Sequence, residues 1–145
     1  MTGAGDVRGM LDTSTVILLA RIENPDDLPD ESVVSAVTLA ELSVGPHVAR
    51  TAKERAARQA HLQQAESDFD TVPFDAAAAR AFGRVAAALR SAGRKPTARA
   101  YDALIAATAI ANDLPLYTCN PADFAAIGEL TVCPVPHPDH HQPDR

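Results

Sequence analysis

Short apolar runs alternate with longer helix-forming segments along the 145 residues of the chain. Pro73 interrupts the third apolar run, and Pro134 restricts the last one to a sheet edge or end, because proline has no N–H to donate to a neighbouring strand. The runs therefore predict about four to five short strands, at residues 7–11, 32–36, 69–74, 114–118 and 131–135.

The segments between these runs have helix-forming composition and carry capping residues. Gly45-Pro46 ends or kinks a helix that begins near Thr38, and Gly93 suits the C-terminal cap of a long alanine-rich helix. Helices are predicted around residues 16–19, from Thr38, at residues 51–67, 75–91 and 98–112, and in a short turn that starts at Pro121.

This alternation is typical of the α/β class, with a central parallel sheet flanked by helices. Residues 7–135 are predicted to form one domain, preceded by a loose leader at residues 1–6. Residues 136–145 are rich in proline, aspartate and histidine and are predicted to be a disordered tail. We expect the tail histidines, His137, His140 and His141, to bind metal only adventitiously.

Composition narrows the class of protein. No apolar run approaches the roughly 20 residues of a membrane span, and no basic-then-apolar leader is seen. We therefore expect a cytoplasmic protein with no membrane partner. Two cysteines, Cys119 and Cys133, are too few for a disulfide framework and are expected to be reduced core thiols.

The charge is unevenly distributed. A net charge of −6 argues against a protein that coats nucleic acid by bulk charge. Residues 76–101, however, contain no acid, and their basic side chains either follow a phosphate backbone or form a solvated helix face. The basic residues of this band are Arg80, Arg84, Arg90, Arg94, Lys95 and Arg99.

Four acidic residues occupy positions that a metal site uses, but each has a simpler alternative. Asp12 follows the first predicted strand, where ligands of open α/β sheets bind, and it equally suits a helix N-cap. Glu41 lies within the first two turns of a predicted helix, where the helix dipole alone favours an acid.

The other two acids flank the fourth predicted strand. Asp102 begins a nearly uncharged helix, so a metal, Arg99 or a helix cap must compensate for a carboxylate near a buried surface. Asp123 and Asn120 follow the strand at residues 114–118, although Asn-Pro is also an ordinary turn signal. Three or four carboxylates brought together repel one another unless a cation neutralises them. Such an oxygen set suits Mg²⁺ or Mn²⁺, which predicts a metal-dependent hydrolase.

In their order and spacing, these acidic stretches resemble the PIN-domain family and, within it, the VapC-type toxin ribonucleases of bacterial toxin–antitoxin pairs. The resemblance covers residues 7–135. Its matching residues are Leu11-Asp12-Thr13-Ser14, Ala40-Glu41-Leu42 followed by Gly45, Asp102 to Ala109, and Leu116 to Phe124.

The resemblance implies a PIN-like parallel sheet and a Mg²⁺- or Mn²⁺-dependent endoribonuclease that inhibits translation and growth. It also implies an antitoxin partner and a homodimer. The RNA substrate is either transfer RNA or ribosomal RNA. From the basic band, Arg94, Lys95 and Arg99 are the candidate RNA contacts.

Site roles carry over from the family by position. Asp12, Glu41, Asp102 and Asp123 are the expected catalytic acids, and Asp12 and Asp102 the expected direct metal ligands. Glu41 is expected to orient or deprotonate the attacking water. The family's fourth acidic position is Asn120 here, so either Asn120 or Asp123 fills it, which leaves one or two metals open. The family's site hydroxyl maps to Thr13, Ser14 or Thr118.

Two other protein classes that place an acid after the first strand fit this sequence less well. A haloacid-dehalogenase-type phosphatase needs a second Asp two residues after the first, where Ser14 stands. A receiver domain needs a late lysine, and residues 114–135 contain none. The remaining alternative is a non-catalytic PIN-like module that binds RNA or a protein.

Overall fold

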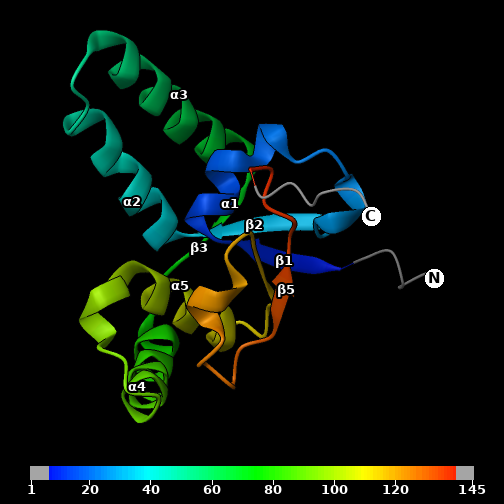
Figure 1. Ribbon diagram of the computed structural model, residues 1–145, viewed down its shortest axis with the longest axis vertical. Helices are drawn as coiled ribbons and strands as arrows, with labels where there is room; N and C mark the ends of the chain where they lie inside the picture. The colour runs from blue at the N-terminus through cyan, green and yellow to red at the C-terminus, as the bar shows by residue number, and fades with distance from the viewer. Residues whose placement is uncertain (1–6, 140–145) are drawn as a thin grey trace.

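The computed structural model describes residues 7–139, apart from the side chains of Pro96 and Ala98 (Figure 1). The predicted leader at residues 1–6, the tail beyond Asp139, and His140 and His141 lie outside the described residues. In the described part of the predicted tail, Asp139 forms an ion pair with Arg21.

A single parallel sheet of five strands forms the centre of the molecule, in the order β3-β2-β1-β4-β5. Met10 in the middle strand pairs with Val33 on one side and Leu116 on the other. The predicted α/β fold with a parallel sheet is confirmed, and Pro134 lies on an edge strand as its missing N–H requires. The strands are β1 (Arg8–Leu11), β2 (Glu31–Ser35), β3 (Asp70–Val72), β4 (Leu116–Thr118) and β5 (Val132–Pro134).

Helices cover both faces of this sheet (Figure 1). The α-helices are α1 (Thr13–Leu18), α2 (Ala36–His47), α3 (Ala52–Asp68), α4 (Ala76–Ser91) and α5 (Ala100–Ala111). Short 3-10 turns are η2 (Leu19–Arg21), η3 (Pro25–Asp27), η4 (Pro96–Arg99) and η5 (Pro121–Phe124). Within the described residues, no helix is long and apolar enough to cross a membrane.

The two faces follow from the alternation of side chains along each strand. Met10 and Val33 point into a core shared with α4 and α5, whereas Leu11 and Val34 point into a second core beneath α1, α2 and α3. Figure 1 shows α2 and α3 projecting together on one side of the sheet and α4 and α5 on the other.

Several element boundaries differ from the sequence prediction. β2 ends at Ser35 instead of residue 36, and α2 begins at Ala36 instead of near Thr38. The reason is that the Ser35 hydroxyl accepts a hydrogen bond from Val37 N and so caps the helix. The predicted helix at residues 98–112 is divided between η4 and α5.

The turn after α4 follows the prediction. Gly93 has φ +77°, a conformation that costs glycine little because it has no Cβ. Gly93 N bonds to Arg90 O and Arg94 N to Leu89 O, which closes the C-terminus of α4. This cap fixes where the chain leaves the helix and therefore where Arg94 and Lys95 lie.

Candidate active site

The C-terminal ends of β1 and β4 lie side by side in the sheet. Asp12 follows β1 directly, and Asn120 lies two residues after the end of β4. Open α/β sheets bind their ligands at this end of the strands. The parallel topology therefore brings together positions that are more than 100 residues apart in sequence, as the Thr118–Asp12 hydrogen bond shows.

Asp12 is held by several hydrogen-bond donors although it is only 3% exposed. Its Oδ1 accepts from Thr15 N at 3.1 Å and from the Thr15 hydroxyl. Its Oδ2 accepts from Ser14 Oγ at 3.2 Å and Thr118 Oγ1 at 2.8 Å. Asp12 thus caps α1 and lines the cleft at once, so the two alternatives that the sequence offered are compatible.

Asn120 is connected to Asp12 through a hydroxyl. Its Nδ2 donates to Ser14 Oγ at 3.0 Å, and Ser14 in turn donates to Asp12. Its backbone N donates to Thr118 Oγ1 at 2.9 Å. Asn120 therefore bonds to two of the three hydroxyls that hold Asp12, in addition to lining the cleft.

Glu41 reaches the cleft from the second turn of α2. Ser35, and not Glu41, caps this helix. A hydrogen bond of 3.1 Å between Thr13 Oγ1 and Thr38 Oγ1 ties α1 to α2 beside it. Within the described residues, Glu41 Oε1 is a buried side-chain oxygen with no hydrogen-bond partner. A buried acceptor without a donor is costly, so it indicates a partner that the protein itself does not supply.

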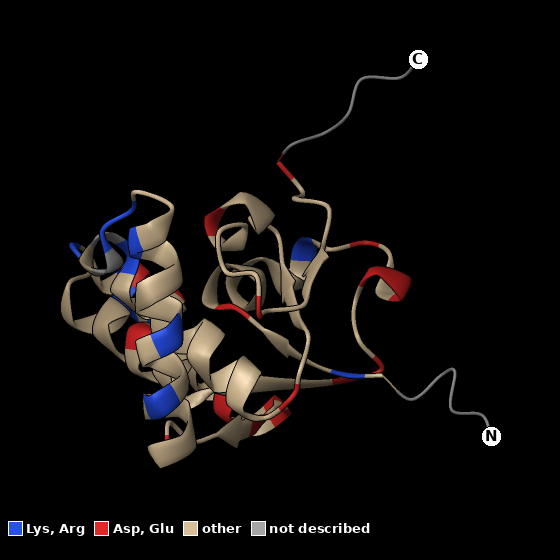
Figure 2. Cartoon of the chain, turned by 90° about the horizontal axis from the view of Figure 1, so that it is seen from below, with Lys and Arg blue, Asp and Glu red and all other residues tan. Residues whose placement is uncertain are grey.

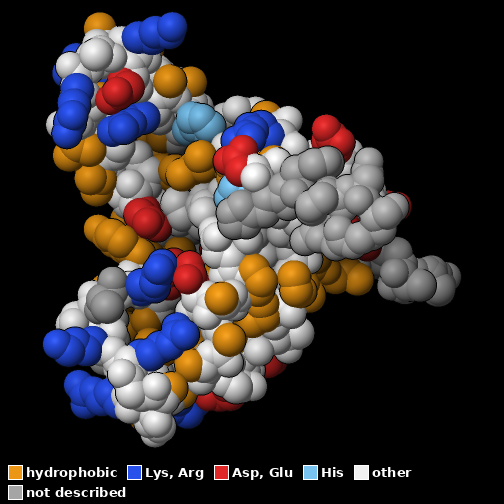
Figure 3. All heavy atoms as spheres, in the orientation of Figure 1, with side chains coloured by type: hydrophobic (Ala, Val, Ile, Leu, Met, Phe, Trp, Pro, Cys, Tyr) orange, Lys and Arg blue, Asp and Glu red, His pale blue; other side chains and the backbone are white. Residues whose placement is uncertain are grey.

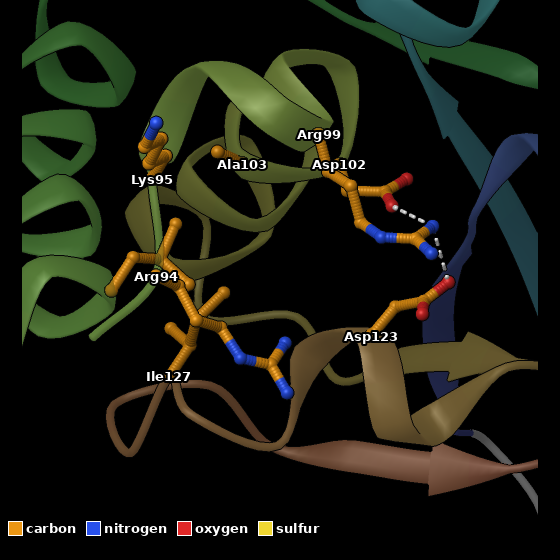
Figure 4. A pocket seen from close by; sticks show the side chains of 8 residues that line it. Arg94, Lys95, Arg99, Asp102, Ala103, Asp123 and Ile127 are labelled. Carbon is orange, nitrogen blue, oxygen red and sulfur yellow. Dashed lines mark hydrogen bonds and ion pairs between the residues drawn. The ribbon is translucent and has the colours of Figure 1, made fainter. Parts of the chain in front are cut away.

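Asp102 and Asp123 face each other across one guanidinium (Figure 4). Arg99 Nη1 lies 3.1 Å from Asp123 Oδ2 and 3.7 Å from Asp102 Oδ2. The two carboxylates are only about a quarter exposed, at 26% and 25%. Asp123, rather than Asn120, supplies the fourth negative charge at this site.

The pKa of Asp102 is raised partly because the other acids of the cleft lie near it. Burial is the first cause that raises this pKa from 3.8 to about 6, and repulsion from Asp12, Asp123 and Glu41 raises it further, while Arg99 opposes the rise. Asp102 therefore lies within electrostatic range of all three other acids.

A cleft of about 540 Å³ joins these groups. It brings together the predicted acids, Asn120, Thr13, Ser14 and Arg99, whereas Arg94 and Lys95 line an adjoining cavity. Thr118 lies buried behind Asp12. The lining side chains are those of Asp12, Thr13, Ser14, Ile17, Glu41, Thr97, Arg99, Ala100, Tyr101, Asp102, Asn120 and Asp123.

The donor set fits a hard divalent cation. It consists of carboxylate oxygens, which are the ligands that Mg²⁺ and Mn²⁺ prefer. One of these oxygens, Glu41 Oε1, receives no hydrogen bond from the described residues. Across residues 7–139, no three His, Cys, Asp or Glu side chains lie close enough to hold a metal as they stand. Mg²⁺ keeps several waters and needs only one or two carboxylates, so a closed cage is not required.

The predicted RNA contacts lie beside the carboxylates. Arg99 lines the cleft, and Arg94 and Lys95 line an adjoining cavity. Figure 2 shows the basic residues concentrated over the helices on one side of the molecule. The basic band does not act as one surface, because Arg84 forms an ion pair with Glu129 at 2.9 Å and Arg90 lines neither cavity.

Two contributors were missed by sequence reasoning. Thr15 gives Asp12 both its backbone N–H and its hydroxyl, and the spacing of three residues from a capping Asp was the available signal. Tyr101 lines the cleft with 44% of its surface exposed, and only its place next to Asp102 pointed to it.

Comparison with known proteins agrees with this geometry. Residues 10–130 match the PIN domain family. Ribonuclease VapC5 of Mycobacterium tuberculosis is 40% identical over 121 residues, which cover 82% of this chain and 87% of the relative. Ribonuclease VapC of Rickettsia bellii is 29% identical over 133 residues, which cover 90% of this chain and 98% of the relative.

A solved structure shares the fold over most of its length. The crystal structure of VapBC-5 from Mycobacterium tuberculosis, a member of the VapBC family of toxin–antitoxin systems, contains a chain with a TM-score of 0.76 and 34% identity. The match covers 89% of this chain and 99% of that chain. The chain described here therefore belongs to the PIN-domain family and, within it, to the VapC group.

Proposed function

We propose that the protein is an endoribonuclease that depends on a divalent cation and acts as the toxin of a toxin–antitoxin pair. The observation that carries this proposal is the buried Glu41 Oε1, which has no hydrogen-bond partner among the described residues, in a cleft that four carboxylates line. The relatives named Ribonuclease VapC give the substrate class.

The residues of the cleft divide the work of hydrolysis. Asp12 and Asp102 would hold Mg²⁺ or Mn²⁺, with Asp123 close by. When bound, such a cation would lower the pKa of a water molecule and would neutralise negative charge on the phosphodiester. Hydrogen bonds from Thr15, Ser14 and Thr118 keep Asp12 in one orientation.

The proposal gives Glu41 the role of acting on the nucleophile. Its Oε1 is buried in the cleft wall and accepts no hydrogen bond from the described residues. It is therefore free to accept a proton from the water that attacks phosphorus, as a general base.

The proposed toxin role includes a protein partner. Structural neighbours of this chain come from toxin–antitoxin complexes, including VapBC-5 of Mycobacterium tuberculosis. Val44 on α2 and Val48 just after it are 45% and 61% exposed, and Figure 3 shows apolar side chains along the arm that α2 and α3 form. Exposed apolar side chains of this kind suit an antitoxin segment. We further propose that the protein is a homodimer, which light scattering of the purified chain tests.

The proposal predicts that the cleft carboxylates are required for cleavage. Purified wild-type protein should cleave RNA with Mg²⁺ or Mn²⁺ and stop when a chelator is added. Asp12→Asn and Glu41→Gln should each lower the cleavage rate roughly a hundredfold or more, because each removes charge or a base from the site. Glu66→Gln on the exposed face of α3 is the matched control and should cleave at the wild-type rate.

Two outcomes would contradict this assignment. Wild-type cleavage by a folded Asp12→Asn variant would remove Asp12 from the site. RNA binding by the wild-type protein without cation-dependent cleavage would instead favour a non-catalytic PIN-like module. Transfer RNA and ribosomal RNA are tested in parallel, and growth arrest on expression, relieved by the neighbouring antitoxin gene, tests the toxin role.

A further inference from the structure

A second cavity, of about 240 Å³, adjoins the carboxylate cleft (Figure 4). The two share Arg99, Asp102 and Asp123 in their walls. A chain molecule whose reacting bond lies among the carboxylates therefore continues directly into this cavity.

The cavity combines an apolar wall with free positive charge. Leu89, Ala103 and Ile127 are core residues no more than 8% exposed, and the faces that they show to the cavity are apolar. Arg94 and Lys95 lie on the opposite side from Asp102 and Asp123 (Figure 4).

Arg94 and Lys95 differ from the basic residues around them in having no acidic partner. Arg84 and Arg99 are both engaged by carboxylates, whereas within residues 7–139 neither Arg94 nor Lys95 forms an ion pair. The cap at Gly93 pins the backbone at this point through the bond from Arg94 N to Leu89 O, 2.8 Å long. The two cations are thus held beside the cavity with their charge available to a ligand.

These features select a nucleotide as the occupant. The cavity is several times the roughly 30 Å³ that one water takes in the liquid, which is room for a group of about one ring. A flat base suits the apolar wall, and a phosphate suits the free cations. An acidic peptide would offer the cations the same charge but no flat ring for the apolar wall of Leu89, Ala103 and Ile127.

We propose that this cavity binds the nucleotide next to the bond that is cleaved, with its base against Leu89, Ala103 and Ile127. Arg94 and Lys95 point in different directions (Figure 4), so each faces a different phosphate of the strand. This inference rests on the proposed ribonuclease function. It assigns Arg94 and Lys95 as substrate-positioning residues, separate from the carboxylates. A base inside the cavity cannot be paired, so the nucleotide bound there is single-stranded.

Binding measurements on Arg94→Gln and Lys95→Gln test the cationic side. A fluorescent single-stranded RNA is titrated against full-length protein in chelator, where no cleavage occurs, at several salt concentrations. Each variant should bind about fivefold more weakly, and its logarithmic salt dependence should be shallower by about 0.7, the value for one lost phosphate contact on a single strand. Arg94→Lys should recover most of the affinity because it restores the charge.

Arg90→Gln is the matched control. It removes the same charge from an exposed position in the last turn of α4, and Arg90 lines neither cavity. Its affinity should change less than about twofold, as expected for a distant, screened charge. Equal losses in Arg94→Gln and Arg90→Gln would overturn the proposal, because they would mean bulk attraction and no defined subsite.

The apolar side is tested by changing the RNA, so that no variant has to fold. An abasic nucleotide is moved one position at a time through the region around the cleavage point. A single neighbouring position should show at least about fivefold weaker binding, since a base that is bound contributes there and nowhere else. Equal tolerance at every position would overturn the subsite.

The outcomes separate this inference from the proposed function. If cleavage depends on the cation but Arg94→Gln behaves like Arg90→Gln, the nuclease function is supported and the subsite is rejected. If an abasic nucleotide weakens RNA binding at one position only but no cleavage occurs, the subsite is supported and the nuclease function is rejected. Failure of the wild-type protein to bind RNA removes both.

Discussion

At the scale of single residues, Asp12 and Asp102 are both acids of the cleft, but the protein treats them differently. Asp12 is almost fully buried and accepts four hydrogen bonds, so its charge is satisfied locally. Asp102 has Arg99 at 3.7 Å and is repelled by the other acids. Asp12 is thus the firmly held carboxylate of the cleft, and Asp102 the one whose charge is disfavoured.

This difference predicts how Asp102 affects stability in the absence of a cation. Its pKa in the folded protein is about 6, above the ordinary 3.8, so folding favours the protonated form. The contribution of Asp102 to the free energy of unfolding therefore falls as pH rises from about 4 through 6 and is constant above that. The full shift corresponds to at most about 3 kcal/mol, since one unit is about 1.4 kcal/mol.

Asp102→Asn should therefore stabilise the metal-free protein at pH 7.5. A gain of about 1–2 kcal/mol remains after the loss of the partly exposed Arg99 pair, and it corresponds to several degrees in melting temperature. At pH 4 the gain should disappear. Thermal unfolding in chelator at both pH values measures this, and a gain of the same size at pH 4 would show that the ionised form of Asp102 is not its cause.

At the scale of elements, the turn after α4 decides whether Arg94 and Lys95 reach the second cavity. Gly83 and Gly93 offer a matched pair of positions, because a Cβ added at either one meets no atom within 4 Å. They differ in backbone conformation, since Gly83 lies inside α4 and Gly93 has φ +77°.

The same substitution should therefore have opposite effects at the two positions. Gly93→Ala should destabilise the protein by roughly 1 kcal/mol, because an L side chain is strained at positive φ. Gly83→Ala should stabilise it by roughly 0.5–1 kcal/mol, because alanine is the better helix residue. Denaturant unfolding of both variants measures this, and two changes of the same sign would contradict the role of the cap.

Most elements could be predicted because their signals are local. The caps at Asp12 and Gly93 each depend on residues within one turn, and the structure has them where the sequence places them. The end of β2 was misplaced because Ser35 reads equally well as a strand residue and as a helix cap.

At the scale of the whole molecule, the sequence predicted which acids line the cleft but not how they are arranged in space. Asp12, Glu41, Asp102 and Asp123 were each marked by their place near a strand end or a helix start, and the fold brings them to one cleft. Asp123 lines the cleft because of where η5 directs it, while Asn120 bonds to Ser14, and no local signal in the sequence contains this arrangement. The second cavity forms only when the turn after α4 packs against η5 and Ile127, so sequence spacing gives no sign of it.

Because the carboxylates come from elements spread over the whole chain, a cation that binds them should stabilise the entire fold. Mn²⁺ at about 100 times its dissociation constant should raise the free energy of unfolding by about 3 kcal/mol at pH 7.5. Below the Asp102 pKa of about 6, a proton competes with the cation, so binding at pH 5 should be about tenfold weaker. Thermal unfolding with and without Mn²⁺ at the two pH values measures this, with Asp12→Asn as the variant that should lose most of the effect. An equal rise in melting temperature in wild-type protein and in Asp12→Asn would place the cation elsewhere on the molecule.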